Sequence, residues 1–337
     1  MSSKSVDRQS PRLWALLALQ LALIALLYGL DRSGEAPEVG PLLEFDASAV
    51  DELVIEEPNS APLRLARNAS GWQLVVPGEE APSTPADADK VEETLDKLAD
   101  LAAPWPVATS ASAEARFEVA DDNHQRAVRL AVGGKQVASL LLGTSPGFRR
   151  LHVRESGDNR IFEVDLAHFD FSVNADDWID RSVLAAAGDV TALERAGAWQ
   201  MTLGDGGWSL TGENASDPAT AVDAAKASDL VARFANLRIL GAAATTPQGE
   251  PIAEFGVTDG QGVQRLKLYR DDGAPEYTVL SDRHPVGFRL AAFVGEQLLQ
   301  DRAALLPAAD ATLEDASQDA LQDAAKKAAA DAGGPSE

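Results

Sequence analysis

Residues 63–74 read LRLARNASGWQL, and residues 200–210 read QMTLGDGGWSL. In both stretches, apolar and polar residues alternate on either side of a turn that contains glycine, and this period of two predicts a β-hairpin. Both second strands carry the same Gly-Trp-x-Leu phrase. We therefore expect one hairpin design to be used twice, with Trp72 and Trp208 as equivalent core residues and Trp178 as a further core residue.

The surroundings of the two hairpins follow one plan. A short opening segment precedes each hairpin, and a polar stretch and then apolar residues at helical spacing follow it. These apolar residues are Ala88, Val91, Leu95, Leu98 and Leu101 in the first case, with Asp87 or Asp89 as a cap, and Ala221, Ala225, Leu230, Phe234 and Leu237 in the second. Further strands are predicted after each helix, at 128–132, 138–142 and 151–153 and at 265–269 and 277–280.

The sequence thus predicts an α+β fold made of two tandem related copies, residues 42–184 and 185–307. Each copy is expected to be a mostly antiparallel sheet with its long helix covering one face. A doubly wound parallel sheet would need helices between most strands, and the sequence does not predict them. Both copies close on an Asp-Arg pair, Asp180-Arg181 or Asp301-Arg302, which we expect to lie on a helix.

An uncharged apolar stretch, Leu13–Leu30, precedes the two copies. As a helix it would rise about 27 Å, which is close to the hydrocarbon thickness of a bilayer, so we expect a transmembrane helix at 13–30. Residues 1–12 are net positive, and positive flanks stay in the cytoplasm, which places the body outside it beyond a linker at 31–41. A cleaved signal peptide is the alternative, although no Ala-x-Ala site follows Leu30.

The composition limits both the partners and the chemistry. A net charge of −24, from 53 acidic and 29 basic residues, argues against binding to nucleic acid and against peripheral binding to anionic lipid. The absence of cysteine excludes disulfides and a lipid-modified cysteine anchor, so the core alone must stabilise the body. The acidic, alanine-rich tail at 308–337 has too few large apolar residues for a core and is predicted to be frayed helix or disorder.

No catalytic or cofactor motif occurs in the sequence. None of the four histidines is four residues from another, as a helical metal site would need. They are His124, His152, His168 and His284. The acidic run 121–124 predicts a solvated turn, and Ser145 lies in a Gly-Thr-Ser-Pro-Gly loop, with no nucleophile turn in the chain. We therefore expect a protein without catalytic residues, metal or cofactor.

Three residues are candidates for contact with a partner protein. Trp105 lies between two prolines, where its ring is either exposed to a partner or packed on its own domain. Arg181 and Arg302 lie at the ends of the two copies, and arginine is favoured as an anchor at interfaces. The alternative is structural, with each arginine reaching back to a carboxylate or to strand carbonyls.

The order of these features resembles the DUF4340 family of bacterial proteins of unknown function. The resemblance covers roughly Leu42 to Leu305 and rests on the basic start, the apolar span and five segments. These are Phe45-Asp46 with Val50-Asp51, Gly71–Leu74, Ala86–Val91, Leu140–Gly143 and Trp178–Arg181. The resemblance implies a membrane-anchored envelope protein, encoded in some genomes beside ABC-type transporter components like those of gliding-motility systems. It transfers no catalytic residue.

We therefore expect a non-enzymatic protein that is anchored once in the bacterial inner membrane, with its body in the periplasm. Its expected role is that of an accessory or substrate-contacting subunit of an ABC-type transport complex. Membrane lipid, through the N-terminal helix, and integral-membrane transporter components are the expected partners. The alternative is a periplasmic solute- or glycan-binding module that uses the cleft between the copies. A hydrolase would instead need His152, His168 or His284 to meet a serine or carboxylates in space.

Overall fold

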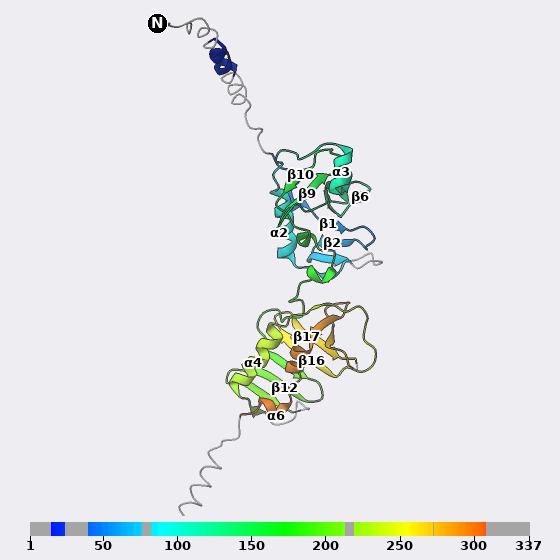
Figure 1. Cartoon of the computed structure of the whole chain (residues 1–337). Coiled ribbons are helices and arrows are strands. Elements are labelled where there is room, and N and C mark those ends of the chain that lie inside the picture. Colours follow the sequence, from blue (N-terminus) through cyan, green and yellow to red (C-terminus); the bar gives the residue numbers. More distant parts are fainter. Residues whose placement is uncertain (1–14, 24–39, 76–81, 213–218, 272, 308–337) are drawn as a thin grey trace, which may run out of the picture. The chain divides into compact units, whose positions relative to one another are not determined.

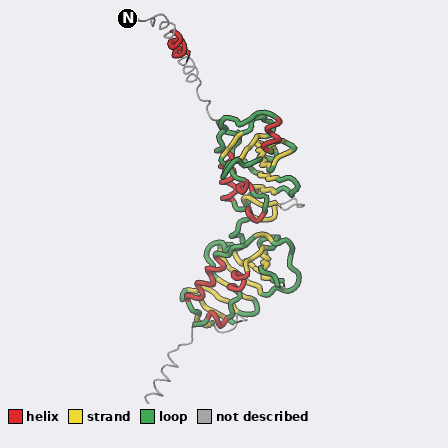
Figure 2. The backbone as a smooth tube through the Cα atoms, in the orientation of Figure 1, coloured by secondary structure: helices red, strands yellow, loops and turns green. Residues whose placement is uncertain are grey.

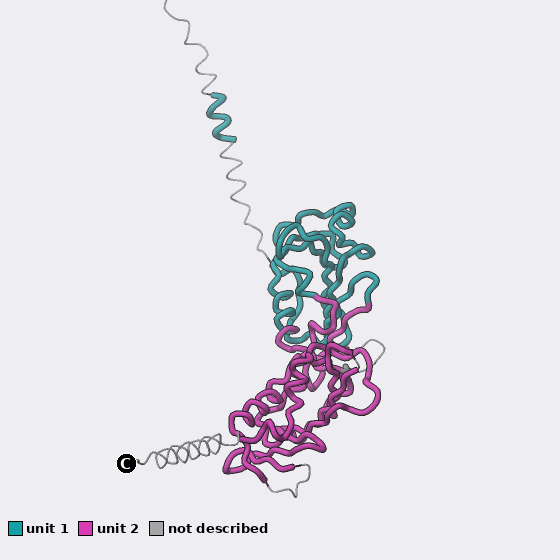
Figure 3. The backbone as a smooth tube through the Cα atoms, turned by 60° about the horizontal axis from the view of Figure 1, so that its bottom comes forward, with its two compact units in different colours: residues 1–60, 92–171 teal, residues 61–91, 172–337 magenta. Residues whose placement is uncertain are grey.

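The computed structural model describes residues 15–23, 40–75, 82–212, 219–271 and 273–307. The chain divides into two compact units (Figure 3), and each is considered by itself below. Unit 1 comprises residues 1–60 and 92–171, and unit 2 comprises residues 61–91 and 172–337. Mostly antiparallel sheets with several helices lying against them (Figure 1, Figure 2) confirm the predicted α+β class.

The first sheet has eight strands in the order β10-β9-β8-β7-β1-β2-β3-β4. The strands are β1 (Glu52–Glu56), β2 (Leu63–Asn68), β3 (Gly71–Val75), β4 (Pro82–Pro85), β7 (Arg126–Val132), β8 (Lys135–Leu142), β9 (Leu151–Glu155) and β10 (Phe162–Val164). A separate two-stranded hairpin joins β5 (Val119–Ala120) to β6 (Asn123–His124) around the turn predicted at 121–124.

The second sheet has nine strands in the order β14-β13-β12-β11-β16-β17-β18-β19-β15. The strands are β11 (Ala192–Arg195), β12 (Trp199–Gly204), β13 (Gly207–Thr211), β14 (Thr220–Ala221), β15 (Gly241–Ala242), β16 (Ala253–Asp259), β17 (Gly262–Tyr269), β18 (Glu276–Ser281) and β19 (Phe288–Ala291). Apart from β15, this order repeats that of the first sheet. In both sheets, a strand that comes after the long helix in the chain pairs antiparallel with the first strand: β7 pairs with β1, and β16, which follows the short β15, pairs with β11.

The two long helices begin at capping aspartates. They are α2 (Ala88–Ala99), α3 (Ala111–Phe117), α4 (Ala224–Ala235), α5 (Ala292–Leu298) and α6 (Arg302–Leu305), with 3-10 turns η1 (Ala47–Ala49), η2 (His168–Phe171) and η3 (Ala175–Asp177). The Asp87 carboxylate accepts the amide of Lys90, and Asp223 accepts the amides of Ala225 and Lys226. Both long helices were predicted from apolar spacing, although Ala221 and Leu237 lie outside α4.

The two predicted hairpins are confirmed. Gly71 and Gly207 begin the second strands with φ of 101° and 99°, a conformation that glycine adopts without the penalty of a side chain. Gly71 pairs with Asn68 in the first hairpin, and Gly207 pairs with Gly204 in the second. The same local signals therefore produced the same turn in both places.

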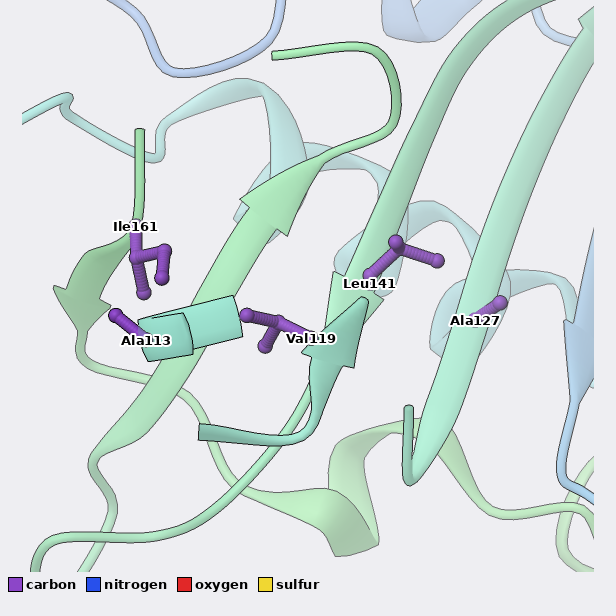
Figure 4. Close-up of a cluster of buried hydrophobic side chains, with 5 residues drawn as sticks. All are labelled: Ala113, Val119, Ala127, Leu141 and Ile161. Atoms are coloured by element: carbon purple, nitrogen blue, oxygen red, sulfur yellow. The ribbon is translucent and has the colours of Figure 1, made fainter. Parts of the chain in front are cut away.

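The core of unit 1 includes a small cluster beneath α3 (Figure 4). Its members come from α3, β5, β7, β8 and the residue before β10, and they are Ala113, Val119, Ala127, Leu141 and Ile161. Gly143 comes directly after β8, the strand that contributes Leu141 to this cluster. A Cβ atom at residue 143 would overlap the carbonyl oxygen of Phe117. The end of β8 therefore approaches α3 closely, because the residue at 143 has no side chain.

Two predictions about individual residues are wrong. Trp72 and Trp178 are buried, but Trp208 is only half-buried, and Trp199 at the start of β12 is the core tryptophan of the second sheet. The Trp199 indole donates a hydrogen bond to the carbonyl of Gln300, which satisfies its buried N–H, whereas Trp208 pairs with the exposed Leu203 near the hairpin tip. Arg181 lies in a turn, whereas Arg302 begins the short α6 as expected.

Much of the predicted membrane span lies outside the described residues. Residues 15–23 are helical and exposed, and they form the central part of the predicted span at 13–30. Among the described residues, no helix is long and apolar enough to cross a bilayer. The predicted cytoplasmic start 1–12, most of the linker 31–41 and the tail 308–337 also lie outside the described ranges.

Candidate functional site

Trp105 is one of the large apolar side chains that unit 1 exposes, with 76% of its surface accessible. The ring lines a cleft of about 440 Å³ together with Pro41, Arg160 and Phe162. Arg160 lies over the ring of Phe162 and forms an ion pair with Asp158, and Glu44 also lines the cleft, so the lining combines apolar surface with charges of both signs. Of the two possibilities for Trp105, the structure shows the exposed one.

Backbone hydrogen bonds fix both sides of the Trp105 segment. On one side, the amide of Ala103 donates to the carbonyl of Gly40 over 2.9 Å. On the other side, the amide of Val107 donates to Ile161, and the amide of Ile161 donates back to Ala108. The exposed ring is therefore carried by a segment held at both ends.

A second exposed aromatic side chain, Phe148, lies in the loop between β8 and β9. Gly147 and Arg150 form an isolated bridge, so Phe148 and Arg149 form the tip of a tight turn. The Ser145 hydroxyl bonds to the carbonyls of Gly147 and Arg150, each at 2.8 Å, and Arg149 has a φ of 53°. A residue with a side chain costs roughly 1–2 kcal/mol at such a φ. The hydrogen bonds of Ser145 hold the turn in this conformation, and Phe148 at its tip is 89% exposed.

The surroundings of Phe148 add charge and further apolar surface. Arg149 lies over the ring of Phe169, which is 63% exposed, and Arg150 forms an ion pair with Glu163 of β10 at 3.0 Å. Sequence reasoning placed 143–147 in a loop but gave Phe148 no role. The signal that it passed over is an aromatic residue beside two arginines in a strongly acidic chain.

Unit 2 contains a different cleft, of about 550 Å³. Its lining is aliphatic, with three threonines as its polar members. The lining residues are Ala61, Pro62, Leu63, Leu74, Val75, Thr84, Val173, Ala175, Ala242, Ala243, Ala244, Thr245, Thr246, Pro285, Val286 and Gly287. A site of this size and character suits a small ligand.

The two candidate arginines lie in unit 2, whereas Trp105 lies in unit 1. Arg181 is exposed, and within the described part of the chain its guanidinium makes no hydrogen bond or ion pair. Arg302 is half-buried and donates to the Thr220 hydroxyl at 3.2 Å, which fixes α6 beside β14. Arg302 thus has a structural contact of the kind foreseen in the alternative reading, although it reaches a hydroxyl and not a carboxylate or a carbonyl.

The histidines interact mainly with the backbone and with aromatic rings. His152 stacks on Phe117 at 4.1 Å and bonds to the Thr144 hydroxyl at 2.9 Å. The His168 ring forms a hydrogen bond with the carbonyl of Gly143, and the His284 ring meets the Phe288 ring edge-on. Burial lowers the pKa of both histidines. Among the described residues, no three His, Cys, Asp or Glu side chains converge as a metal site would require.

The family of the chain follows from a comparison with protein-family models. The model described as a domain of unknown function, DUF4340, matches residues 72–259. The chain belongs to the DUF4340 family. This confirms the resemblance inferred from the ordered segments. Curated proteins and solved structures gave no match.

The DUF4340 match extends from β3 to β16 and therefore includes parts of both sheets. It contains Trp105, Phe148 and Arg181, whereas Arg302 lies beyond it. The candidate partner-contacting residues of unit 1 thus belong to the part of the chain that the DUF4340 model describes.

Proposed function

We propose that this DUF4340 chain is a non-enzymatic protein, anchored once in the bacterial inner membrane, with its body in the periplasm. In this proposal it is an accessory or substrate-contacting subunit of an ABC-type transport complex of the gliding-motility kind. The membrane anchor is supported by the apolar stretch 13–30, and the transporter partner by the family resemblance. The contact role is supported by the exposed aromatic side chains of unit 1.

The observation that carries the proposal is the fixed exposure of Trp105 and Phe148. Aromatic residues and arginine are the side chains that most often dominate the energy of protein interfaces. Burial of a Phe-sized side chain is worth about 1.5–3 kcal/mol. Because the turn that presents Phe148 is already fixed by Ser145, a partner would bury this ring without first ordering the loop.

The same proposal includes a doubled body, residues 42–184 and 185–307. The identical order of eight strands in the two sheets, with a long helix inserted at the same point, supports a duplication. The repeated Gly-Trp-x-Leu strand supports it as well.

The partner role is tested by purifying the tagged full-length chain from solubilised membranes and identifying what accompanies it. We expect an integral-membrane component of an ABC transporter to co-purify. The variants Trp105→Ser and Phe148→Ser should each reduce its recovery at least tenfold, since about 1.4 kcal/mol corresponds to that factor. The matched control is Phe293→Ser in α5, where the ring is 65% exposed in unit 2.

Two results would count against the proposal. Isolation of the chain alone in every detergent and salt condition contradicts a complex. Equal recovery of the partner by Trp105→Ser, Phe148→Ser and the Phe293→Ser control contradicts the assigned surface, while leaving the complex in place.

The membrane orientation has its own test, which uses the absence of native cysteine. A single cysteine introduced as Ser60→Cys, at an exposed position of the body, should react with a membrane-impermeant maleimide in intact spheroplasts. A cysteine introduced as Ser3→Cys should react only after lysis. The reverse pattern would place the body in the cytoplasm.

A further inference from the structure

We propose that the cleft of unit 2 binds a saturated alkyl or acyl chain whose head carries one uncharged hydrogen-bonding group. This binding site does not include Trp105 or Phe148 and does not depend on the transport complex. The lining of the cleft, one buried hydroxyl and the contacts of its wall point to this ligand.

The lining selects against most classes of small molecule. None of the lining residues carries a charge, so phosphates, carboxylates and ammonium groups would lose their hydration without a partner. None carries an aromatic ring, so the cleft offers no face on which a sugar or a nucleobase could stack. The remaining surface, formed by alanine, valine, leucine and proline, complements a flexible aliphatic chain.

Thr84 supplies the polar feature of the site. It is 1% exposed, and its Oγ1 has no hydrogen-bond partner within the described residues. Buried polar groups are almost always paired, because an unpaired one has given up its hydrogen bonds to water. A ligand with an alcohol, ester or amide group beside the alkyl chain would satisfy this hydroxyl.

Contacts with η3 and with β19 hold the wall around residues 242–246. Asp176 accepts the amide of Ala242 at 3.2 Å and pairs with Arg289, which also forms an ion pair with Glu276 at 3.1 Å. At Gly241, any Cβ atom would overlap the Asp176 carboxylate. This close contact ties η3 to β15, and both elements contribute lining residues to the cleft.

Photolabelling of the full-length chain in phosphatidylcholine nanodiscs tests the proposal. One probe is a decan-1-ol analogue with a diazirine in its chain, and the other is a phosphatidylcholine with the diazirine in one acyl chain. After irradiation, mass spectrometry should find label within 242–246 and 285–287, and excess unlabelled decan-1-ol should reduce it at least tenfold. Label from the alcohol alone identifies a free single chain, whereas label from the phospholipid identifies a lipid tail. Label from neither probe overturns the proposal.

Variants separate cleft binding from general partition into the membrane. Ala244→Trp places a large side chain at the exposed rim of the cleft and should lower the labelling there at least tenfold. Ala232→Trp, on the exposed face of α4, is the matched control and should leave it unchanged. Equal labelling in both variants, or label confined to the apolar stretch 13–30, overturns the site.

Thr84→Val tests the assigned head group, because valine keeps the shape and removes the hydroxyl. In the wild-type chain, labelling by the decan-1-ol probe should exceed labelling by the corresponding decane probe about fivefold, because one hydrogen bond contributes about 1 kcal/mol. Thr84→Val should abolish this difference. An equal preference in both proteins shows that the hydroxyl does not select the ligand. Thermal denaturation verifies that each variant is folded.

Discussion

Asp259 at the end of β16 offers a sharp test of what stabilises unit 2. Its carboxylate is fully buried and accepts four hydrogen bonds, each 2.8 Å long. Arg283 donates one to each oxygen, the amide of Ala187 donates to Oδ2, and the amide of Gln261 donates to Oδ1. The Arg283 guanidinium holds the pKa of this carboxyl well below its usual range. Asp259 thus fastens the segment before β11 to the second sheet.

The informative change is Asp259→Asn, which preserves the size of the side chain. Each oxygen of the Asp259 carboxylate accepts two N–H groups. In the variant, the side-chain amide nitrogen takes the place of one oxygen in either orientation, and because it is itself a donor, two hydrogen bonds are lost. Hydrogen bonds to charged groups contribute about 1.5–3 kcal/mol each, so we expect the free energy of unfolding of unit 2 to fall by about 3–5 kcal/mol. The control is Asp282→Asn, at an exposed carboxylate that, among the described residues, accepts only the amide of Arg265, and this change should cost less than about 1 kcal/mol.

Hydrogen exchange read by mass spectrometry localises the effect, because the amides of β16 and β17 should lose protection in Asp259→Asn and keep it in Asp282→Asn. The pH dependence adds a second requirement. The folded pKa of Asp259 lies below its ordinary value of 3.8, so its contribution is complete at neutral pH and is lost as the pH falls below 3.8. The gap between wild type and Asp259→Asn should therefore narrow in acid. A cost under 1 kcal/mol, or a gap that stays constant in acid, would refute the reasoning.

Three further predictions concern stability. Thr84→Val should raise the free energy of unfolding by about 1 kcal/mol in urea denaturation, because it removes a buried hydroxyl without a partner among the described residues; a loss of stability would contradict this. Gly241→Ala should lower it by about 1–3 kcal/mol, since the methyl group overlaps the Asp176 carboxylate, and Asp176→Ala in the same chain should recover part of this loss. Burial lowers the pKa of His168 and of His284 in the folded state, so the unfolded chain binds protons at a higher pH than the folded chain does. The free energy of unfolding should therefore fall as the pH drops through 6.5. A variant with both histidines changed to glutamine should show a weaker dependence of this free energy on pH.

The sequence predicted the features that depend on neighbours along the chain. The hairpin at Gly71 and the one at Gly207 follow from local alternation and from a glycine at positive φ, and α2 and α4 follow from a cap and apolar spacing. These signals act over a few residues, so they can be recognised in the sequence without knowledge of the tertiary structure.

Features that depend on distant partners were missed. The strand β16 (AEFGVTD) was not predicted, although its apolar residues Ala253, Phe255 and Val257 recur with a period of two. Its central glycine lowers the local strand propensity, and pairing with both β11 and β17 stabilises it as a strand. Trp208 matches Trp72 in its local phrase, yet Trp199 fills the core, where the carbonyl of the distant Gln300 accepts its indole N–H.

The candidate site was only partly visible in the sequence. The prolines around Trp105 left two alternatives open, a ring exposed to a partner or a ring packed on its own domain, and in the structure the ring is exposed. The exposure of Phe148 depends on the turn closed by Ser145 and on an uncommon backbone conformation at Arg149, neither of which composition reveals. The unit 2 cleft joins residues from six separate stretches of the chain, so no local pattern predicts it.

The pairing of β1 with β7 also sets the order in which this protein reaches its native state. Leu53 of β1 can pair with Leu130 of β7 only after β2, β3, β4 and the long helix α2 have been synthesised. Leu193 of β11 can likewise pair with Val257 of β16 only after the corresponding elements of the second sheet. Sheets closed by such distant pairs fold slowly, because the entropy of the intervening loop is lost before the contacts form. Until then, the edges of β1 and β11 are open to other chains. We therefore expect folding to be limited by the pairing of β7 and β16 with these first strands, with aggregation as the competing process.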